Sequence, residues 1–232
     1  MRVAGSIVSV PRLSVVTPSY EQREYLRETL DSVRRQSYPD VEHVVVDGGS
    51  TDGSVDLLDT YAEAHGEEDG YRLRWRSERD EGQADAVNRG FDAVSGEVVG
   101  WLNADDAYFD AGVFERVRRY FRRTGADVVY GDAALVDRDS RLLKLYCVPS
   151  FDYAKLRRYC FLEQPAVFLH ERALADDRLD TDLEYAMDYE FWLRLARRYR
   201  FVHVEDVLAV DRNHPERKIL RDRAAMLSEP ET

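Results

Sequence analysis

Acidic side chains stand just after several predicted strands of this chain, in the place where open α/β sheets bind their ligands. These acids are Glu21, Asp47, Asp80, Asp105 and Asp106. Since 45 of the 232 residues are Asp or Glu, a single acid in such a loop carries little information. Acids after successive strands, however, converge on one edge of a parallel sheet. The sequence therefore predicts a carboxylate-lined ligand site at that edge.

Asp105 and Asp106 are adjacent and follow a buried strand predicted over 97–102. Neighbouring carboxylates repel one another unless a cation neutralises them. Mg²⁺ and Mn²⁺ accept carboxylate oxygens together with substrate phosphates. The pair therefore indicates a divalent-cation site that bridges an acidic protein to a diphosphate. The alternative, that one of the two acids caps the following turn, stays open at this point.

The segment Asp47–Gly53 reads DGGSTDG and follows a strand predicted over 41–46. It matches neither GxGxxG nor GxxxxGK[ST], which excludes the Rossmann dinucleotide motif and the P-loop. An aspartate at a strand end suits hydrogen bonds from a base N–H group or a ribose hydroxyl. The other interpretation is a glycine-rich turn in which Ser50 or Asp52 caps a helix. Both hold together if Asp47 contacts the ligand and Asp52 the helix.

Asp188 lies in the first turn of a helix predicted over 186–199. The apolar row of that helix, which faces the core, recurs every fourth residue and consists of Met187, Phe191, Leu195 and Tyr199. A carboxylate beside such a row is partly desolvated, which raises its pKa and makes it a better proton acceptor. The competing interpretation is an acid that interacts favourably with the helix dipole.

His214 lies in a predicted loop that reads DRNHP. A histidine in a loop is usually solvated. Beside a metal ion and a diphosphate, it would be a ligand or a hydrogen-bond donor to phosphate.

Strands and helices alternate through the first half. Strands are predicted over 13–17, 41–46, 71–76, 97–102 and 127–130, and helices over 21–36, 52–61, 83–93 and 112–121. This alternation predicts an α/β fold with a mostly parallel sheet and helices on both faces.

The regular alternation of strands and helices ends after Gly131. The predicted elements are two strands within 133–148 around a polar turn, a helix over 151–159, strands over 166–169, 201–204 and 207–210, and a polar tail from 219. With no repeat or linker in the sequence, the second half is expected to extend one sheet within a single domain.

The composition excludes several classes of protein. Against 33 Lys and Arg, the 45 acids give a net charge of −12, which argues against nucleic-acid binding by charge. Cys147 and Cys160 are the only cysteines, too few for a disulfide framework or a cysteine-built zinc site. Without a membrane-length apolar run or a signal-peptide pattern, a soluble intracellular protein is expected. Only 3 of the 33 basic residues are lysine, which fits either a salt-adapted proteome or a GC-rich genome.

Five motifs, in this order and spacing, resemble those of the family 2 glycosyltransferases. They are VVTPSYE (15–21), VVVDGGSTDGS (44–54), DEGQADAVNRG (80–90), WLNADD (101–106) and MDYEFWLR (187–194). The resemblance extends over roughly residues 12–215. It implies a GT-A-type fold, Rossmann-like, with a smaller acceptor-side extension. It also implies transfer of a sugar, with inversion, from a nucleotide-diphosphate sugar to an acceptor hydroxyl.

The resemblance also implies where the halves divide. About 12–106 would bind the nucleotide sugar, about 107–215 the acceptor, and 216–232 would be a tail of the single domain 1–232. Pro18, Tyr20 and Glu21 would flank the base and ribose, and Asp47 and Asp80 would accept hydrogen bonds from them.

The metal site and the catalytic base follow from the same resemblance. The segment 103–105 takes the place of the DxD motif, so Asp105 and Asp106 would hold Mn²⁺ or Mg²⁺ on the diphosphate. His214 falls where relatives have a metal-site or diphosphate histidine, and Asp188 where they have the catalytic base.

Two positions depart from the family pattern. Asn103 replaces the first acid of DxD, which makes that nucleotide-sugar contact neutral, and Met187 replaces the acid before the base. These departures are the basis of one alternative, a degenerate sugar-nucleotide-binding or partner protein without catalysis. A nucleotidyltransferase is a weaker alternative, because the loop 17–23 has only one basic residue with which to grip a triphosphate.

The expected partners are a UDP-, GDP- or dTDP-linked sugar and a saccharide or lipid-linked acceptor, as in the synthesis of cell-surface polysaccharide. No basic amphipathic helix is evident, so membrane contact would be peripheral at most. The expected location is the cytoplasm, including the inner face of the membrane.

Overall fold

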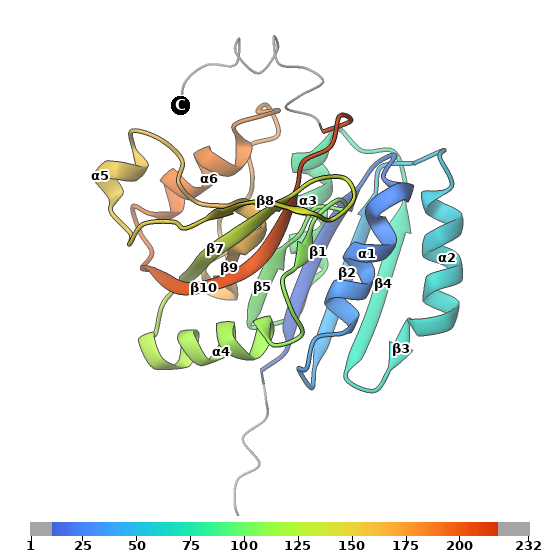
Figure 1. Cartoon of the computed structure of the whole chain (residues 1–232), viewed down its shortest axis with the longest axis horizontal. Coiled ribbons are helices and arrows are strands. Elements are labelled where there is room, and N and C mark those ends of the chain that lie inside the picture. Colours follow the sequence, from blue (N-terminus) through green and yellow to red (C-terminus); the bar gives the residue numbers. More distant parts are fainter. Residues whose placement is uncertain (1–10, 218–232) are drawn as a thin grey trace, which may run out of the picture.

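The computed structural model describes residues 11–217, which build a 10-stranded mixed sheet with helices on both faces (Figure 1). The strands are β1 (Leu13–Ser19), β2 (Val41–Asp47), β3 (Glu67–Glu68), β4 (Tyr71–Ser77), β5 (Val98–Trp101), β6 (Ala107–Tyr108), β7 (Val128–Val136), β8 (Leu142–Tyr146), β9 (Val167–His170) and β10 (Phe201–Arg212). The helices are α1 (Arg23–Arg34), α2 (Ser54–His65), α3 (Gln83–Ala93), α4 (Val113–Thr124), α5 (Tyr153–Leu156) and α6 (Met187–Leu195), with 3₁₀ turns η1 (Gln164–Ala166) and η2 (Glu171–Ala173).

The first half of the sheet is parallel, in the order β4-β2-β1-β5. Its strands are short runs of β-branched and apolar residues, and β1 and β2 are buried along their whole length. In the register of these strands Ser19 pairs with Asp47, and Asp47 pairs with Ser77. The carboxyl ends of three strands therefore lie side by side, as the sequence predicted.

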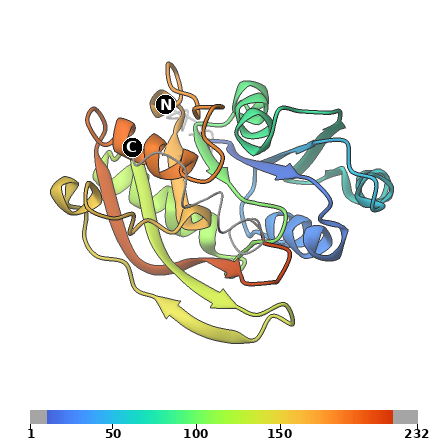
Figure 2. The ribbon, with the colours of Figure 1, turned by 90° about the horizontal axis from the view of Figure 1, so that it is seen from above.

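The second half continues the same sheet. β9 runs antiparallel between β5 and β7, and β10 lies parallel to β7. β8 forms the outer edge beside β7 (Figure 2). The two-residue strand β6 pairs with the end of β10, which brings the loop after β5 against the last strand of the described chain.

Side chains alternate between two hydrophobic cores, one on each face of the sheet. On β1, Val15 packs into the core under α1, α2 and α4, and Val16 into the core under α3, α5 and α6. The predicted apolar row of α6 lies in the second core: Met187, Phe191 and Leu195 are buried and Tyr199 packs against them. The molecule is thus a three-layer α/β/α sandwich, which confirms the predicted fold class.

Several predicted boundaries differ from the structure. The two late strands are one strand, β10, because the polar pair Glu205–Asp206 forms an irregularity within it instead of ending it. The predicted helix over 151–159 is the single turn α5, and the helix over 186–199 ends at Leu195. The predicted polar tail from 219 lies outside the described residues.

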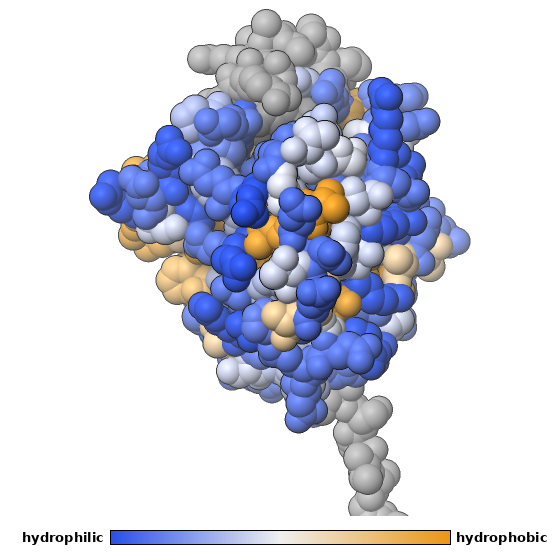
Figure 3. All heavy atoms as spheres, turned by 90° about the vertical axis from the view of Figure 1, so that its right-hand side faces the viewer, coloured by the Kyte–Doolittle hydropathy of each residue, from blue (hydrophilic) through white to orange (hydrophobic). Residues whose placement is uncertain are grey.

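The outer surface agrees with the charged composition. The face over α2 is covered mainly by hydrophilic side chains, with only small apolar areas (Figure 3). Between residues 11 and 217 no helix is both long and apolar enough to span a bilayer.

Candidate active site

Asp47 ends β2 at the centre of the predicted site, where its carboxylate is fully buried. Oδ2 accepts hydrogen bonds from the backbone of Gly49 (3.0 Å) and Ser50 (2.9 Å) and from Ser77 Oγ (2.6 Å), and Oδ1 accepts one from Ser50 Oγ (2.6 Å). The carboxylate therefore holds the 47–53 loop against β4. A base or ribose would have to share oxygens that the loop already uses.

Asp80 lies directly over that loop. A Cβ atom on Gly48 would stand 2.7 Å from Asp80 Oδ2, so glycine is what allows this approach. Asp80 Oδ1 accepts a hydrogen bond from the backbone of Gly82 (3.0 Å), and Oδ2 accepts none within the described part of the chain. Burial, more than any other effect, raises the pKa of Asp80. The structure thus brings Asp47 and Asp80 together, and Asp80 has the freer carboxylate for a ligand.

The loop after β1 carries the next three predicted residues. Pro18 is buried within β1, whereas the Tyr20 side chain is 62% exposed. Glu21 has a positive φ of 54°, and its Oε1 accepts hydrogen bonds from the backbone (2.7 Å) and hydroxyl (3.1 Å) of Thr51. Glu21 therefore links the loops after β1 and β2, and Tyr20 is a free aromatic ring beside them.

Asp52 holds the starts of two helices together. Its Oδ1 accepts a hydrogen bond from the backbone of Ser54 (2.9 Å), and its Oδ2 accepts one from the backbone of Arg23 (2.9 Å). Asp52 thus contacts the start of the helix as predicted, but Gly53, and not Ser50 or Asp52, is the N-cap of α2.

Asn103 is the hub of an amide network. Its Oδ1 accepts hydrogen bonds from Gln83 Nε2 (2.8 Å) and Trp101 Nε1 (3.0 Å). Its Nδ2 donates to Gln164 Oε1 (2.9 Å), and Gln164 Nε2 donates to the carbonyl of Trp101 (2.7 Å). An aspartate could not supply the donor that Gln164 receives. The departure from DxD at this position therefore has a structural reason.

Asp105 and His214 meet although they are far apart in the sequence. His214 Nε2 lies 2.9 Å from Asp105 Oδ2, and Nδ1 lies 3.2 Å from Glu216 Oε2. The imidazole is buried and packs against the Tyr25 ring with centroids 4.6 Å apart. Burial opposes protonation, but the hydrogen bonds to Asp105 and Glu216 outweigh it and raise the pKa of His214. His214 is thus a buried hydrogen-bond partner of Asp105 whose protonated form is favoured, not a solvated loop histidine.

Asp106 is buried behind Asp105. Its Oδ1 accepts a hydrogen bond from the backbone of Arg212 (3.0 Å), which ties it to the end of β10. Burial raises the pKa of Asp106 well above its usual range, and the charges of Asp105 and Asp211 raise it further. Asp211 forms an ion pair with Arg217 (2.5 Å). Arg217 is thus the nearby cation that offsets this group of acids.

The expected metal ligands do not form a preformed cage. Among residues 11–217, no group of three His, Cys, Asp or Glu side chains is arranged to hold a metal ion. Asp106 is directed at β10, and His214 Nε2 is engaged by Asp105. However, Asp105 Oδ1 accepts no hydrogen bond within the described chain. One free carboxylate oxygen fits a cation that keeps several waters and takes its other ligands from substrate phosphates.

Asp188 stands in the first turn of α6, between the buried Met187 and the partly buried Tyr189. Its Oδ1 accepts a hydrogen bond from the backbone of Tyr189 (2.7 Å), and Oδ2 accepts none within the described residues. Burial raises the pKa of Asp188, as the apolar row beside it predicted. Asp188 is therefore a partly desolvated carboxylate with one oxygen free to accept a proton.

For several residues of this site the sequence predicted no functional role. They are Gln83, Gln164, Glu163, Asp211 and Arg217. Gln83 is the first residue of α3, and the other four lie beside turns or at a strand end without hydrophobic periodicity. Only the pairing of β6 with β10 brings Asp211 and Arg217 beside Asp105. Two of them, Asp211 and Arg217, flank His214 and could have been considered with it.

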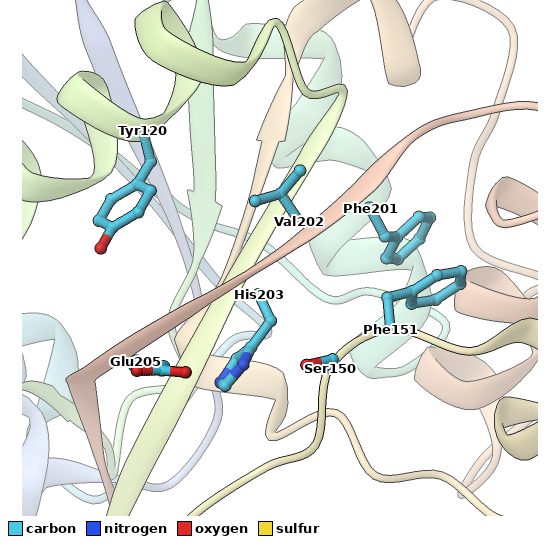
Figure 4. A pocket seen from close by; sticks show the side chains of 7 residues that line it. All are labelled: Tyr120, Ser150, Phe151, Phe201, Val202, His203 and Glu205. Atoms are coloured by element: carbon cyan, nitrogen blue, oxygen red, sulfur yellow. The ribbon is translucent and has the colours of Figure 1, made fainter.

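An open hollow of about 430 Å³ lies at the other end of β10. Its lining includes Phe151, Phe201 and His203 (Figure 4). Phe151 stacks on Phe201 with centroids 4.7 Å apart, and His203 Nε2 lies 3.3 Å from Asp132 Oδ1. None of the acids at the strand ends contributes to this hollow, so it is not the predicted site.

Known proteins resemble the chain in both sequence and fold. The "PGL/p-HBAD biosynthesis glycosyltransferase" of Mycobacterium tuberculosis is 36% identical over 129 residues, which are 55% of this chain and 49% of that protein. An "Uncharacterized glycosyltransferase" of Rickettsia prowazekii is 28% identical over 219 residues, 88% of this chain and 64% of that protein. The chain thus spans about half of the length of the first relative and about two thirds of the second.

Two solved structures share the fold. S. aureus TarS 1-349 in complex with UDP-GlcNAc superposes with a TM-score of 0.72 at 18% identity, covering 91% of this chain and 61% of that chain. The mannosyltransferase PcManGT from Pyrobaculum calidifontis, in complex with GDP-Man and Mn2+, has a TM-score of 0.67 at 24% identity, covering 88% and 57%. These likenesses confirm the GT-A-type fold. The sequence profile described as Glycosyl transferase family 2 matches residues 14–174, and this chain therefore belongs to that family.

Proposed function

We propose that the protein transfers a sugar, with inversion, from a nucleoside-diphosphate sugar to an acceptor hydroxyl, with Asp188 as the base. The observation that carries the proposal is the free, partly desolvated carboxylate of Asp188 in a family 2 chain whose strand ends gather Asp47, Asp80 and Asp105. In support, relatives are named glycosyltransferases, and neighbours of the same fold bind UDP, UDP-GlcNAc and GDP-Man.

The reaction needs few groups. Asp188 removes the proton of the acceptor hydroxyl while that oxygen attacks C1 of the donor sugar. The bond from C1 to the diphosphate oxygen breaks, and its electron pair leaves with the nucleoside diphosphate. His214, whose protonation its hydrogen bonds to Asp105 and Glu216 favour, and Arg217 would offset the charge that builds on the diphosphate. Much of the remaining reduction in activation free energy comes from holding the donor and the acceptor in line for the attack.

A divalent cation, Mn²⁺ or Mg²⁺, belongs to the proposal. Asp105 would hold it through its free oxygen, with Asp106 and His214 as neighbours. The ion would act as a Lewis acid on the diphosphate. The Mn²⁺ in the mannosyltransferase of the same fold supports this assignment. We expect the unmodified protein to bind UDP or GDP more tightly with Mn²⁺ by calorimetry, and Asp105→Ala to lose that difference. Equal affinity with and without Mn²⁺ in the unmodified protein would remove the ion from the proposal.

A thermal-shift screen identifies the donor as the nucleotide sugar that raises the Tm of the protein. A panel of UDP-, GDP- and dTDP-sugars with Mn²⁺ is screened, and a ligand at 100 times its Kd stabilises the folded state by about 2.7 kcal/mol. For a protein of this size, each kcal/mol raises Tm by about 2–4 °C. The stabilising donor is then incubated with candidate acceptors, and release of the nucleoside diphosphate is measured.

Replacing the base separates an enzyme from a binding protein. We expect Asp188→Asn to reduce transfer by at least about 100-fold, the lower range for a general base, while donor binding survives. Asp56→Asn is the matched control, because Asp56 is also an acid in a first helical turn, on α2, but is exposed. Near-normal transfer by Asp188→Asn would refute the assignment of the base. Donor binding without transfer to any acceptor by the unmodified protein would favour the non-catalytic alternative.

A further inference from the structure

Glu163 is a partly buried carboxylate that the fold does not use. It precedes η1, and its backbone carbonyl accepts the hydrogen bond from Ala166 N (2.9 Å) that begins this turn. An acid at such a position commonly caps the turn with its side chain. Here the side chain does not cap it and forms no hydrogen bond or ion pair within residues 11–217. The carboxylate is therefore available to a ligand.

The backbone beside Glu163 is held firmly at the site. The next residue, Gln164, accepts a hydrogen bond from Asn103 Nδ2 and donates one to the carbonyl of Trp101. Leu162 and Pro165 on either side are buried. These contacts fix Glu163 next to the strand end that carries Asp105, so its position does not depend on its own side chain.

The charges that act on Glu163 come from both sides of the proposed site. Burial has the largest effect on its pKa, which is raised to about 7. The nearby carboxylates of Asp211, on β10, and Asp188, on α6, raise it, while Arg217 and Lys144 lower it. Glu163 thus interacts both with the proposed base and with the acids on the diphosphate side. In the proposed reaction the acceptor binds beside Asp188, within reach of these charges.

This placement restricts what Glu163 can bind. Arg217 and Lys144 also act on Glu163, but Arg217 is already paired with Asp211, and the carboxylates of Glu163 and Asp188 disfavour an anionic group there. A hydroxyl group can donate a hydrogen bond to the carboxylate, and such bonds to charged acceptors are among the stronger ones. Asp188 engages the hydroxyl that reacts. A second carboxylate nearby suits a second hydroxyl of the same molecule.

We propose that Glu163 is an acceptor-binding residue that accepts a hydrogen bond from a non-reacting hydroxyl of a saccharide acceptor. This inference rests on the proposed function and adds the class of acceptor: a molecule with several hydroxyl groups, not an alcohol with one. Glu163 then sets which hydroxyl is presented to Asp188.

The test compares acceptors that differ in their number of hydroxyl groups. The donor found by thermal shift is supplied with p-nitrophenyl pyranosides or with cyclohexanol, which has one hydroxyl. Kinetics are measured for the unmodified protein, Glu163→Ala and the isosteric Glu163→Gln. Glu97→Gln is the control, because Glu97 is an exposed acid at the opposite end of β5. Donor KM, Tm and donor hydrolysis in the absence of acceptor are measured for every variant.

We expect Glu163→Ala to raise the KM for the pyranoside by about 10- to 100-fold, the range for one hydrogen bond to a charged group. Glu163→Gln should have a smaller effect, because its amide oxygen still accepts a hydrogen bond. Donor KM, donor hydrolysis and the slow reaction of cyclohexanol should stay unchanged. Tm should not fall, because the burial that raises the pKa of Glu163 makes its charged form unfavourable to folding near neutral pH. A merely structural role would instead lower Tm and affect both acceptors alike.

Three results overturn the inference. An unchanged pyranoside KM in Glu163→Ala removes Glu163 from acceptor binding, and a raised donor KM assigns it to the donor sugar. Hydrolysis of the donor without transfer to any pyranoside refutes the saccharide class. All three leave the proposed function standing. In contrast, absence of both transfer and donor hydrolysis by the unmodified protein refutes the proposed function itself.

Discussion

Restoring the first acid of the DxD motif should lower the stability of the folded protein. In Asn103→Asp, the new carboxylate still accepts hydrogen bonds from Gln83 and Trp101 but no longer donates one to Gln164 Oε1, 2.9 Å away. Two acceptor oxygens then face one another. If the Gln164 amide turns round, its oxygen instead meets the Trp101 carbonyl, now 2.7 Å from Nε2. Either arrangement leaves a conflict between acceptors, and the longer hydrogen bond that Asn103 Nδ2 donates to Asp106 Oδ2 (3.4 Å) is lost as well.

The cost follows from that conflict. An unsatisfied buried acceptor costs about 1–3 kcal/mol, and more if it is charged. Because Asn103 is only partly buried, we expect a loss of about 2 kcal/mol at pH 7.5, which lowers Tm by about 4–8 °C in a protein of this size. The buried Asp106 nearby opposes a second negative charge, so folding raises the pKa of the new carboxyl above its unfolded value of about 3.9. The deficit should therefore shrink as the pH falls through that folded pKa and vanish below about pH 3.9.

The assay is urea unfolding of the parent, Asn103→Asp, Gln164→Ala and the double variant, at pH 7.5 and pH 5. Gln164→Ala removes the opposing oxygen, so Asn103→Asp should cost less in that background, with a coupling of about 1 kcal/mol. The reasoning is refuted if Asn103→Asp is as stable as the parent at pH 7.5, or if its cost is the same with and without the Gln164 amide.

Three further substitutions probe the scaffold. In Gly90→Ala the new methyl group would overlap Val16 on β1, so we expect a loss of about 1–3 kcal/mol in urea unfolding, despite alanine's better helix propensity; a gain in stability would contradict this packing. In Gly48→Ala the methyl group would stand 2.7 Å from Asp80 Oδ2, so nucleotide affinity by calorimetry should fall several-fold with little change in Tm; an unchanged affinity would remove Asp80 from the nucleotide site. Burial tends to raise the pKa of Glu42, but hydrogen bonds from neighbouring serines outweigh burial and lower that pKa. The carboxylate therefore stabilises the fold at neutral pH, and this contribution is lost as the pH falls below about 4.3. Glu42→Gln should therefore be less stable than the parent at pH 7, and this deficit should be smaller at pH 3. An equal deficit at both pH values would refute this.

The sequence predicted the elements whose pattern is local. The apolar runs of β1 and β2 and the helical spacing of α1 and α3 are visible in any short window, and the structure has these elements within a few residues of the predicted bounds. β3 and β6 have two residues each and leave no periodicity to detect. The split predicted in β10 came from Glu205 and Asp206, whose polarity ends a pattern but not a strand.

The features of the candidate site also divide into those that a local pattern predicts and those that only the folded chain creates. Acids at the carboxyl ends of parallel strands could be predicted, because strand direction alone brings Asp47 and Asp80 together. The free carboxylate of Glu163 could not, because no pattern distinguishes it from the many other acids of this chain. The environment of Asp47 was also not predictable, since its four hydrogen bonds come from side chains and backbone groups that only the folded loop assembles.

The pairing of β6 with the end of β10 has a consequence for the order of folding. Asp105 and His214 are 109 positions apart in the chain, and two residue pairs, Ala209 with Tyr108 and Val210 with Ala107, close the loop between them. Contacts of such long sequence separation form slowly, because chain entropy must be lost before they give any stabilisation. During synthesis, the nucleotide-side strands emerge first and can pair while β10 is still being made. The nascent protein should therefore acquire a folded sheet before Asp105 and His214 come together, and the proposed transfer activity should be the last property to appear on refolding.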